Sequence, residues 1–252
     1  MNPSRSWSPP PDQLSLGTGD VHIWRASLEP SPATVAALRQ LLSPDEQARA
    51  DRFHFERDRR HFTVARGYLR KLLGRYLGIA PAEVRFSYAE YGKPALASDL
   101  HQPLKFNLAH SGGLALYAFT LSGEIGIDLE QVRPEFTGDD IARRYFSATE
   151  VACLDQLSET ARHLAFFNCW TRKEAFIKAK GLGLSLGLDQ FDVTLNPDQP
   201  AALLCTRWDE TEAARWSLRE IEVGEKFAAA IALEGHDWEA SYWQVSEEHL
   251  LE

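Results

Sequence analysis

The sequence lacks the features that mark a membrane-spanning or a secreted protein. Its longest clean apolar run, residues 227–233, is far shorter than the roughly 20 residues that a bilayer-spanning helix needs. The N-terminal stretch contains three consecutive prolines and no apolar core of a secretion signal. We therefore expect a cytoplasmic protein in which residues 1–19 form a disordered lead-in.

Cysteine is scarce, because the chain has only Cys153, Cys169 and Cys205. Their odd number and wide spacing, without a C-x-x-C pair, argue against a disulfide framework and against a zinc site. We expect three buried, reduced thiols. The sequence also contains no G-x-G-x-x-G, P-loop, G-x-S-x-G or H-E-x-x-H motif, which removes most dinucleotide-binding, NTPase, hydrolase and zinc-protease functions.

The chain has instead the composition of a folded protein, with 44% hydrophobic and 25% charged residues over 252 positions. That length suits one large domain or two small ones. The net charge of -9 hides a cationic segment, residues 49–75, with nine lysines and arginines against three acidic residues. Such a segment suits a phosphate group or an acidic protein surface, but a solvated helix face would have the same composition.

Two stretches about 104 residues apart begin alike, with a serine followed three positions later by a glutamate. Ser43 with Glu46, and Ser147 with Glu150, match the capping box, in which hydroxyl and carboxylate satisfy free amide groups at the start of a helix. Each stretch therefore predicts a helix start.

Helical apolar spacing follows in both stretches and ends at a glycine, Gly78 in the first and Gly181 in the second. We interpret this as an internal duplication of an α/β unit, with halves over residues 20–123 and 124–252. A single continuous α+β domain is the alternative. The expected strands are residues 22–26, 84–88, 105–108 and 114–121 in the first half, and residues 124–129, 191–195, 216–223 and 227–233 in the second.

Acidic and apolar residues alternate from Gly126 to Glu130, so Asp128 and Glu130 share one face of a strand. Two carboxylates so close repel each other unless a cation lies between them or both face water. The pattern fits a metal site, and it also fits an ordinary solvated strand edge.

Glu174 and Lys178 are four residues apart on a helix rich in Phe and Trp. Such a pair commonly forms a stabilising surface ion pair. On a largely buried helix, however, a surface ion pair does not explain why a carboxylate and an ammonium are present, because burying charged groups is unfavourable. A third carboxylate next to Asp128 and Glu130 would supply that reason, and carboxylate oxygens suit Mg²⁺ better than zinc.

His110 and Ser111 precede two glycines at the end of a strand. Amide groups exposed at glycine, next to a histidine and a hydroxyl, can cradle a phosphate. A lone histidine in a turn is more often structural.

Taken together, EYGKP at residues 90–94, FNLAHSGG at 106–113, GIDLE at 126–130 and WTRKEAFIKAKGLGLSL at 170–186 resemble the signature motifs of the Sfp-type (surfactin-type) 4′-phosphopantetheinyl transferases. The resemblance extends from about residue 42 to residue 193. It implies an α+β fold in which two similar α/β halves form a pseudo-dimer, with the active site in the cleft between them.

The resemblance further implies transfer of 4′-phosphopantetheine from coenzyme A to a serine of an apo acyl or peptidyl carrier protein, with release of adenosine 3′,5′-bisphosphate. It predicts no nucleic-acid partner and no membrane partner, and the doubled chain suggests a monomer. The cofactor would be Mg²⁺, with Mn²⁺ as an alternative. The implied metal ligands are Asp128, Glu130 and Glu174, the catalytic residues are Glu174 as base and Lys178, and the residues that bind coenzyme A are Arg49, His61, Lys93, His110, Ser111 and Lys178.

The chain departs from the family pattern at three positions. Glu46 stands where relatives often have a basic residue, Ala109 where they often have serine, and His61 near an expected arginine. These changes affect the expected contacts with the 3′-phosphate of coenzyme A and leave the implied metal ligands unchanged. Because of these changes, an inactive module that binds a carrier protein or a nucleotide is an alternative function. A Mg²⁺-dependent phosphohydrolase is a further alternative.

Overall fold

The computed structural model describes residues 7–100, 102–136 and 138–247, and it consists of two halves with the same order of elements. The first half contains β1 (Asp20–Ser27), α1 (Pro32–Leu41), α2 (Pro44–Asp51), α3 (Glu56–Leu77), β2 (Phe86–Tyr88), β3 (Pro94–Leu96), β4 (Lys105–Ser111) and β5 (Leu114–Thr120). The second contains β6 (Ile125–Gln131), α4 (Asp139–Tyr145), α5 (Ala148–Asp155), α6 (Glu159–Lys180), β7 (Phe191–Val193), β8 (Leu203–Thr206), β9 (Trp216–Glu220) and β10 (Phe227–Glu234). A last strand, β11 (Glu239–Gln244), follows.

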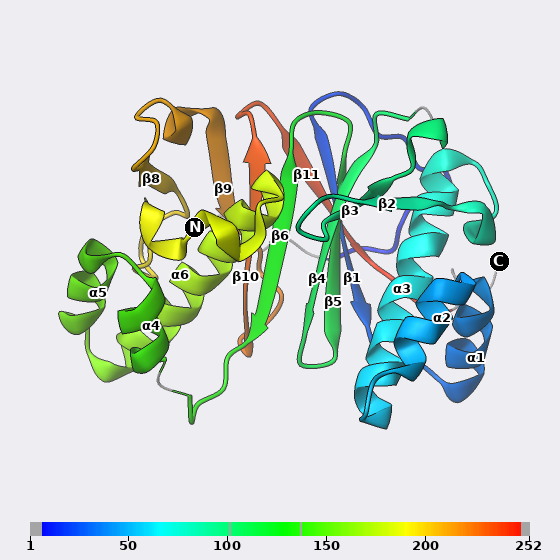
Figure 1. Ribbon diagram of the computed structural model, residues 1–252, viewed down its shortest axis with the longest axis horizontal. Helices are drawn as coiled ribbons and strands as arrows, with labels where there is room; N and C mark the ends of the chain where they lie inside the picture. The colour runs from blue at the N-terminus through cyan, green and yellow to red at the C-terminus, as the bar shows by residue number, and fades with distance from the viewer. Residues whose placement is uncertain (1–6, 101, 137, 248–252) are drawn as a thin grey trace.

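The strands of the two halves pair in the same way. In the first half β1 pairs with β5 and β5 with β4, and in the second β6 pairs with β10 and β10 with β9, all antiparallel. Each half adds a two-stranded hairpin, β2–β3 or β7–β8. The strands fill the middle of the molecule, with α1–α3 at one side and α4–α6 at the other (Figure 1). The predicted fold class, a pseudo-dimer of two α/β halves, is therefore confirmed.

Local signals in the sequence fix where the paired helices begin and end. The predicted capping box forms completely at the start of α5, whereas at the start of α2 the amide of Ser43 donates to Glu46 and the Ser43 hydroxyl donates to Asp45. The longer helices α3 and α6 have 22 residues each and end at Gly78 and Gly181, whose φ angles of 67° and 69° lie in the left-handed region that glycine adopts readily. The expected strands are present, several of them shorter than predicted.

Each half buries a capping glutamate against a cation from its long helix. Glu46 lies 2.6 Å from Arg70 and also pairs with Arg66, and Glu150 lies 2.8 Å from Lys173. Because a charge withdrawn from water needs a partner, these pairs have to form together with the core. Glu46 thus has a structural role.

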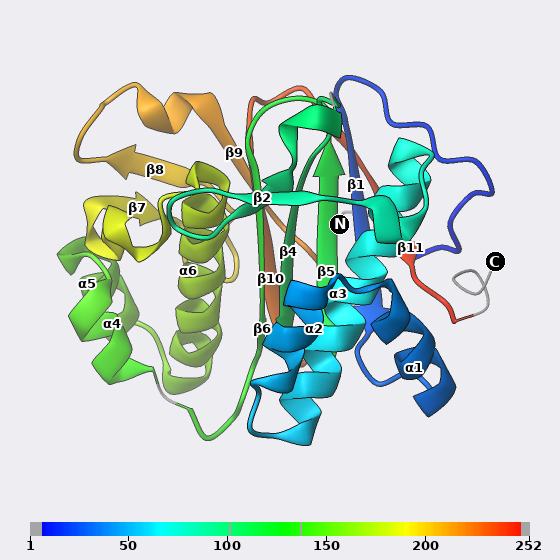
Figure 2. The same ribbon diagram turned by 45° about the vertical axis from the view of Figure 1, so that its right-hand side comes forward.

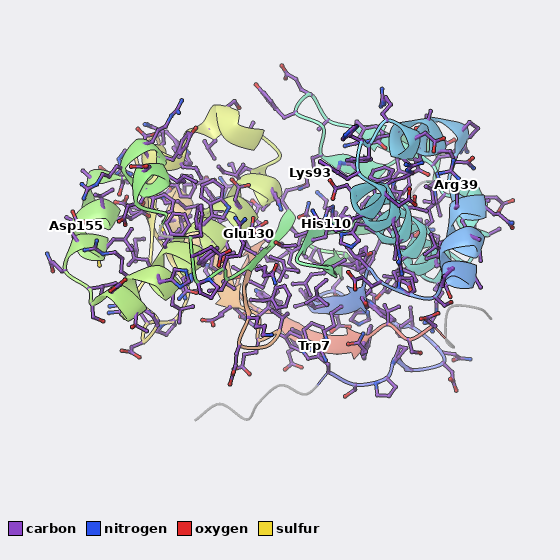
Figure 3. All side chains as sticks on the ribbon, turned by 90° about the horizontal axis from the view of Figure 1, so that it is seen from below. Trp7, Arg39, Lys93, His110, Glu130 and Asp155 are labelled. Atoms are coloured by element: carbon purple, nitrogen blue, oxygen red, sulfur yellow. The ribbon has the colours of Figure 1, made fainter. Side chains whose placement is uncertain are left out.

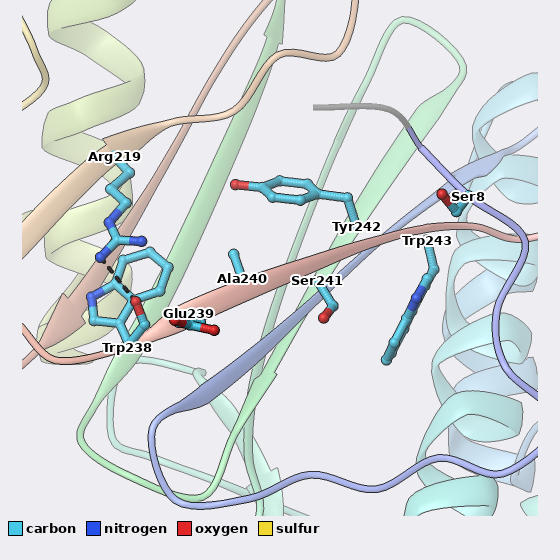
Figure 4. Close-up of a pocket in the computed structure, with 8 residues that line it drawn as sticks. All are labelled: Ser8, Arg219, Trp238, Glu239, Ala240, Ser241, Tyr242 and Trp243. Carbon is cyan, nitrogen blue, oxygen red and sulfur yellow. Dashed lines mark hydrogen bonds between the residues drawn. The ribbon is translucent and has the colours of Figure 1, made fainter. Parts of the chain in front are cut away.

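The last strand crosses from the second half back to the first. β11 pairs in parallel with β1, and Ser8 forms a bridge to Trp243 on its other edge. Trp7 packs against Tyr242, with ring centroids 5.4 Å apart. Figure 4 shows Ser8 beside this strand, which borders a cavity of about 510 Å³.

The ends of the chain therefore differ from expectation. In the lead-in expected over residues 1–19, residues 1–6 lie outside the described residues, and the segment from Trp7 onward packs on β11 because its indole covers an apolar ring. The sequence did not predict β11, and residues 20–123 and 124–252 stay a proposal for the duplicated units.

Three hydrophobic cores hold the molecule together. One lies within the first half and one within the second. The third is shared, since it joins apolar residues of β1, β4 and β5 to those of β6, β10 and β11. The shared core makes the two halves one packed body, in which the β2–β3 hairpin of the first half extends toward α6 of the second (Figure 2).

The expectation of three buried thiols holds in part. All three cysteines are free, but only Cys169 is buried, whereas Cys153 is half-buried and Cys205 is exposed because β8 belongs to a two-stranded hairpin with an open face. Within the described ranges, no helix has both the length and the apolar character that crossing a bilayer requires.

Candidate active site

The site forms where α6 lies directly on β6. On this strand Gly126, Asp128 and Glu130 point to one face, because side chains alternate along a strand. A Cβ atom at Gly126 would overlap the carbonyl oxygen of Ala175 and the amide nitrogen of Ala179. Glycine at this position therefore lets the helix backbone touch the strand, and this contact brings side chains of α6 next to Asp128.

The helix presents two partly exposed side chains at this contact. From residue 171 to residue 179, every residue of α6 is buried except Glu174 and Lys178. They are one turn apart and so lie on the same face. The predicted pair thus faces the site from an otherwise buried helix.

Lys178 Nζ donates a hydrogen bond to Asp128 Oδ1 at 2.6 Å. Asp128 is buried, and its second carboxylate oxygen, Oδ2, is buried without a hydrogen-bond partner. Burial alone would lower the pKa of Lys178, but the neighbouring charge of Asp128, with those of Glu174 and Glu130, raises it above its ordinary value. The ammonium therefore stays charged, and Asp128 keeps one free acceptor.

Glu174 is close enough to Asp128 and Glu130 for their negative charges to shift its pKa. Burial, repulsion by Asp128 and weaker repulsion by Glu130 raise the pKa of Glu174 to about 7, against the opposing effect of Lys178. A carboxyl group with this pKa changes its protonation state near neutral pH, as a general base must.

Glu130 connects the second half to the first. Ser111 Oγ, from β4, donates a hydrogen bond to Glu130 Oε2 at 3.0 Å. Burial and the charge of Asp128 raise the pKa of Glu130, while the Ser111 hydrogen bond opposes this shift. The predicted residues Ser111 and Glu130 are thus in direct contact.

His110 and His61 form a second group beside the carboxylates. The surrounding protein, followed by the neighbouring Lys178 and His61, lowers the pKa of His110, although His110 is exposed at the surface of the site. His61 Nε2 is buried without a hydrogen-bond partner and lies 3.7 Å from Glu29 Oε1. Figure 3 shows His110 and Glu130 in the middle of the molecule, with Asp155 and Arg39 toward opposite ends.

Lys93, a predicted coenzyme A-binding residue, forms hydrogen bonds within the protein. Its ammonium donates three hydrogen bonds, to Glu124 Oε2 at 3.0 Å and to the carbonyl oxygens of Ile125 and Ala179 at 3.2 and 2.8 Å. All three protons are thus used in joining the hairpin of the first half to β6 and α6. A contact with a phosphate would require Lys93 to give up one of these partners.

Arg49 lies on α2 with an exposed side chain, and its guanidinium is 5.3 Å from the ring centre of Phe62. It lines a cavity of about 290 Å³ with Arg52 and Tyr88. In the cationic segment, Arg66 and Arg70 are buried against Glu46, although Arg66 also lines this cavity.

The carboxylates do not form a closed ligand cage by themselves. Across residues 7–100, 102–136 and 138–247, no three His, Cys, Asp or Glu side chains are gathered closely enough to hold a metal ion. The donor set nevertheless fits Mg²⁺, because Asp128 Oδ2 lacks a partner and the pKa values of Glu130 and Glu174 are raised by burial and by nearby negative charge. A cation would relieve both features.

Comparison with known proteins identifies the family of the chain. Residues 124–232 match the model of the 4′-phosphopantetheinyl transferase superfamily, and residues 26–121 match that of the 4′-phosphopantetheinyl transferase N-terminal domain. The chain belongs to the 4′-phosphopantetheinyl transferases.

Relatives of this transferase come from bacteria and animals. It is 39% identical to the 4′-phosphopantetheinyl transferase HetI of Nostoc over 94% of this chain and 98% of that protein. It is 32% identical to the transferase Sfp of Bacillus subtilis over 83% and 90%. The L-aminoadipate-semialdehyde dehydrogenase-phosphopantetheinyl transferase of the mouse is 30% identical over 82% and 72%.

Two residues that hold the elements of the site together were not identified from the sequence. Gly126 permits the close approach of α6, and Asn107, which is buried on β4, accepts a hydrogen bond from the Ile127 amide at 2.9 Å. A glycine inside an apolar strand is the signal that could have identified the first. Asn107 lies within the FNLAHSGG motif, but the motif does not indicate its role, because that role depends on which strand lies beside β4.

Proposed function

We propose that this transferase moves 4′-phosphopantetheine from coenzyme A to a serine hydroxyl of an apo carrier protein in a Mg²⁺-dependent reaction. The observation that carries the proposal is the grouping of Asp128, Glu130 and Glu174 around the Lys178 ammonium. In the reaction, the serine oxygen forms a bond to the β-phosphorus of the coenzyme A diphosphate, and the bond from this phosphorus to the bridging oxygen breaks. Adenosine 3′,5′-bisphosphate is the leaving group.

Asp128, Glu130 and Glu174 would hold Mg²⁺ or Mn²⁺, with the free Asp128 Oδ2 as the first available acceptor. When bound, the ion supplies a Lewis acid that neutralises charge on the diphosphate. Because phosphoryl transfer needs alignment and neutralisation of charge more than covalent help, carboxylates held on a rigid strand and helix suit this task.

Glu174 would take the proton of the carrier serine, directly or through one water molecule. In the metal-free protein the pKa of Glu174 is about 7, and a bound cation would lower it, so the carboxylate would be ionised and able to accept the proton. Lys178, which is protonated before the reaction, would neutralise the leaving phosphate and can donate a proton to it. Its contact with Asp128 holds the ammonium in place for both tasks.

The nucleotide part of coenzyme A would lie against the first half. His110 and His61 are close together, and an anionic phosphate beside them would raise their proton affinity and so strengthen its own binding. Arg49 belongs to the same proposed binding group, and Lys93 and Ser111 would each join it by exchanging a hydrogen bond. The exposed part of the cationic segment is a candidate docking surface for an acidic carrier protein.

The direct test is to incubate the protein with coenzyme A, Mg²⁺ and several apo carrier proteins, and then to weigh the carriers. A gain of one phosphopantetheine group on the active serine supports the proposal. An unchanged mass on every carrier would favour an inactive binding module, and phosphopantetheine released into water would favour a phosphohydrolase. The monomeric state and the cytoplasmic location stay predictions.

A further inference from the structure

Two neighbouring strands from different halves are joined by side chains. β4 is the last strand of one sheet and β6 the first of the other, and they lie side by side (Figure 1). The amide of Ile127 donates to Asn107 Oδ1 at 2.9 Å, and the amide of Gln131 donates to Ser111 Oγ at 3.1 Å. We call these two hydrogen bonds the clasp.

The spacing of the clasp sets the register of the two strands. Asn107 and Ser111 are four residues apart on β4, and the two amides that they bind are four residues apart on β6. Equal spacing in the same chain direction means that the strands run parallel at this place. Side-chain oxygens thus accept the hydrogen bonds that carbonyl oxygens accept in an ordinary ladder.

Ser111 uses its hydroxyl twice. The oxygen accepts the hydrogen bond from Gln131, and the hydroxyl proton goes to Glu130 Oε2 at 3.0 Å. Because one partner fixes the oxygen, the proton has a defined direction, and it orients a carboxylate of the other half.

The clasp lies between the two groups that would hold one substrate. Phe106 packs in the core of α3, and since side chains alternate along β4, His110 points to the same helical side. Asp128 and Glu130 point to the helical side of β6, where Gly126 touches α6. A slip of β6 along β4 would change the distance from His110 to the carboxylates.

We propose that Asn107 and Ser111 are positioning residues of the transfer reaction, which fix the spacing between the nucleotide-binding half and the metal-binding half and orient Glu130 toward the metal ion. This inference rests on the proposed function. A displacement of about 1 Å between reacting groups can cost roughly a hundredfold in rate, so the clasp has a direct effect on turnover.

The test compares Ser111→Ala, its conservative partner Ser111→Thr and the control Ser87→Ala. Ser87 is an exposed serine on β2 whose hydroxyl donates to a carbonyl oxygen of its own hairpin. Amide hydrogen exchange of the metal-free proteins reports on the clasp itself. Calorimetric titration of Mg²⁺ into protein saturated with coenzyme A, together with kcat and KM, reports on the metal site.

We expect Ser111→Ala to speed exchange of the Gln131 amide and to weaken Mg²⁺ binding by roughly 10- to 100-fold, as loss of an outer hydrogen bond to a ligand does. Turnover should fall while KM for the carrier protein stays near the wild-type value. Ser111→Thr should restore both properties, and Ser87→Ala should match the wild type. Asn107→Ala should speed exchange at Ile127.

Wild-type Mg²⁺ affinity and turnover in Ser111→Ala would overturn the proposal, and so would unchanged exchange at Gln131. The wild-type protein separates this failure from failure of the proposed function. If the wild type modifies no carrier protein, the transfer function fails, whereas exchange at Gln131 and Ile127 still tests the clasp on its own.

Discussion

Lys178 on α6 and Asp128 on β6 form a hydrogen-bonded ion pair, with Nζ and Oδ1 2.6 Å apart. The pair joins the two elements that carry the candidate active site. It leaves the second oxygen of Asp128 buried without a partner, while Lys178 keeps nearly a third of its side chain exposed. The ion pair therefore joins α6 to β6, and it leaves one oxygen of Asp128 and part of the Lys178 side chain without a partner in the pair.

Replacing Lys178 by alanine should lower kcat by roughly 10²- to 10³-fold, because the charge that faces the leaving phosphate is lost. The fold should lose about 1–3 kcal/mol as well, because Asp128 stays buried without its partner. Lys180→Ala is a matched control, since Lys180 lies on the same helix and pairs with Glu212 at 2.6 Å, away from β6. Steady-state kinetics and urea unfolding of both variants check the prediction, and equal loss of kcat in both would contradict it.

Gly126→Ala should separate α6 from β6. The added methyl group would overlap backbone atoms of Ala175 and Ala179, and backbone cannot move aside as a flexible side chain can. We expect a loss of about 3 kcal/mol or more in the free energy of unfolding. Gly78→Ala has open space around the new methyl group and only the cost of a left-handed backbone, about 1 kcal/mol. Urea unfolding of the two variants should therefore give clearly different losses, and similar losses would refute the close contact.

The stability of the metal-free protein should depend on Glu174. Because the folded-state pKa is about 7 and therefore lies above the ordinary value of 4.5, the folded state binds a proton that the unfolded state releases. This contribution is fully present below pH 4.5 and is lost as the pH rises through 7. Glu174→Gln should thus be more stable than the wild type at pH 8, by up to about 3 kcal/mol, and equally stable near pH 4. Urea unfolding in EDTA at both pH values measures the difference, and a constant difference would show that Glu174 is not the titrating group.

Introducing a basic residue at position 46 should not improve binding of coenzyme A. Glu46 is buried between Arg66 and Arg70, so Glu46→Lys would place three cations together without water. We expect a loss of about 3–5 kcal/mol, the usual cost of leaving a buried charge unpaired. Thermal unfolding and KM for coenzyme A test this, and a stable variant with lower KM would disprove the structural role of Glu46.

The sequence predicted the parts of the fold that depend on local chemistry. The capping serines Ser43 and Ser147 and the terminal glycines Gly78 and Gly181 act within a few residues, so their roles can be read from sequence neighbours. The duplication followed from the repeat of these signals.

Features that depend on tertiary contacts were not predicted. β11 becomes a strand by pairing with β1, more than 200 positions earlier in the 252-residue chain. Lys93 matches a family motif, but its three hydrogen bonds come from the packing of a hairpin against the other half. The clasp residue Asn107 looks like any polar residue on a strand until its neighbour β6 is known.

The most direct test of the central claim is the mass of an apo carrier protein after incubation with coenzyme A and each of three proteins: the wild type, Asp128→Ala and Glu174→Gln. The account predicts that the wild type adds phosphopantetheine with Mg²⁺ and fails in EDTA. It also predicts that both variants remain folded by circular dichroism but leave the carrier unmodified. Full modification of the carrier by both folded variants would contradict the account.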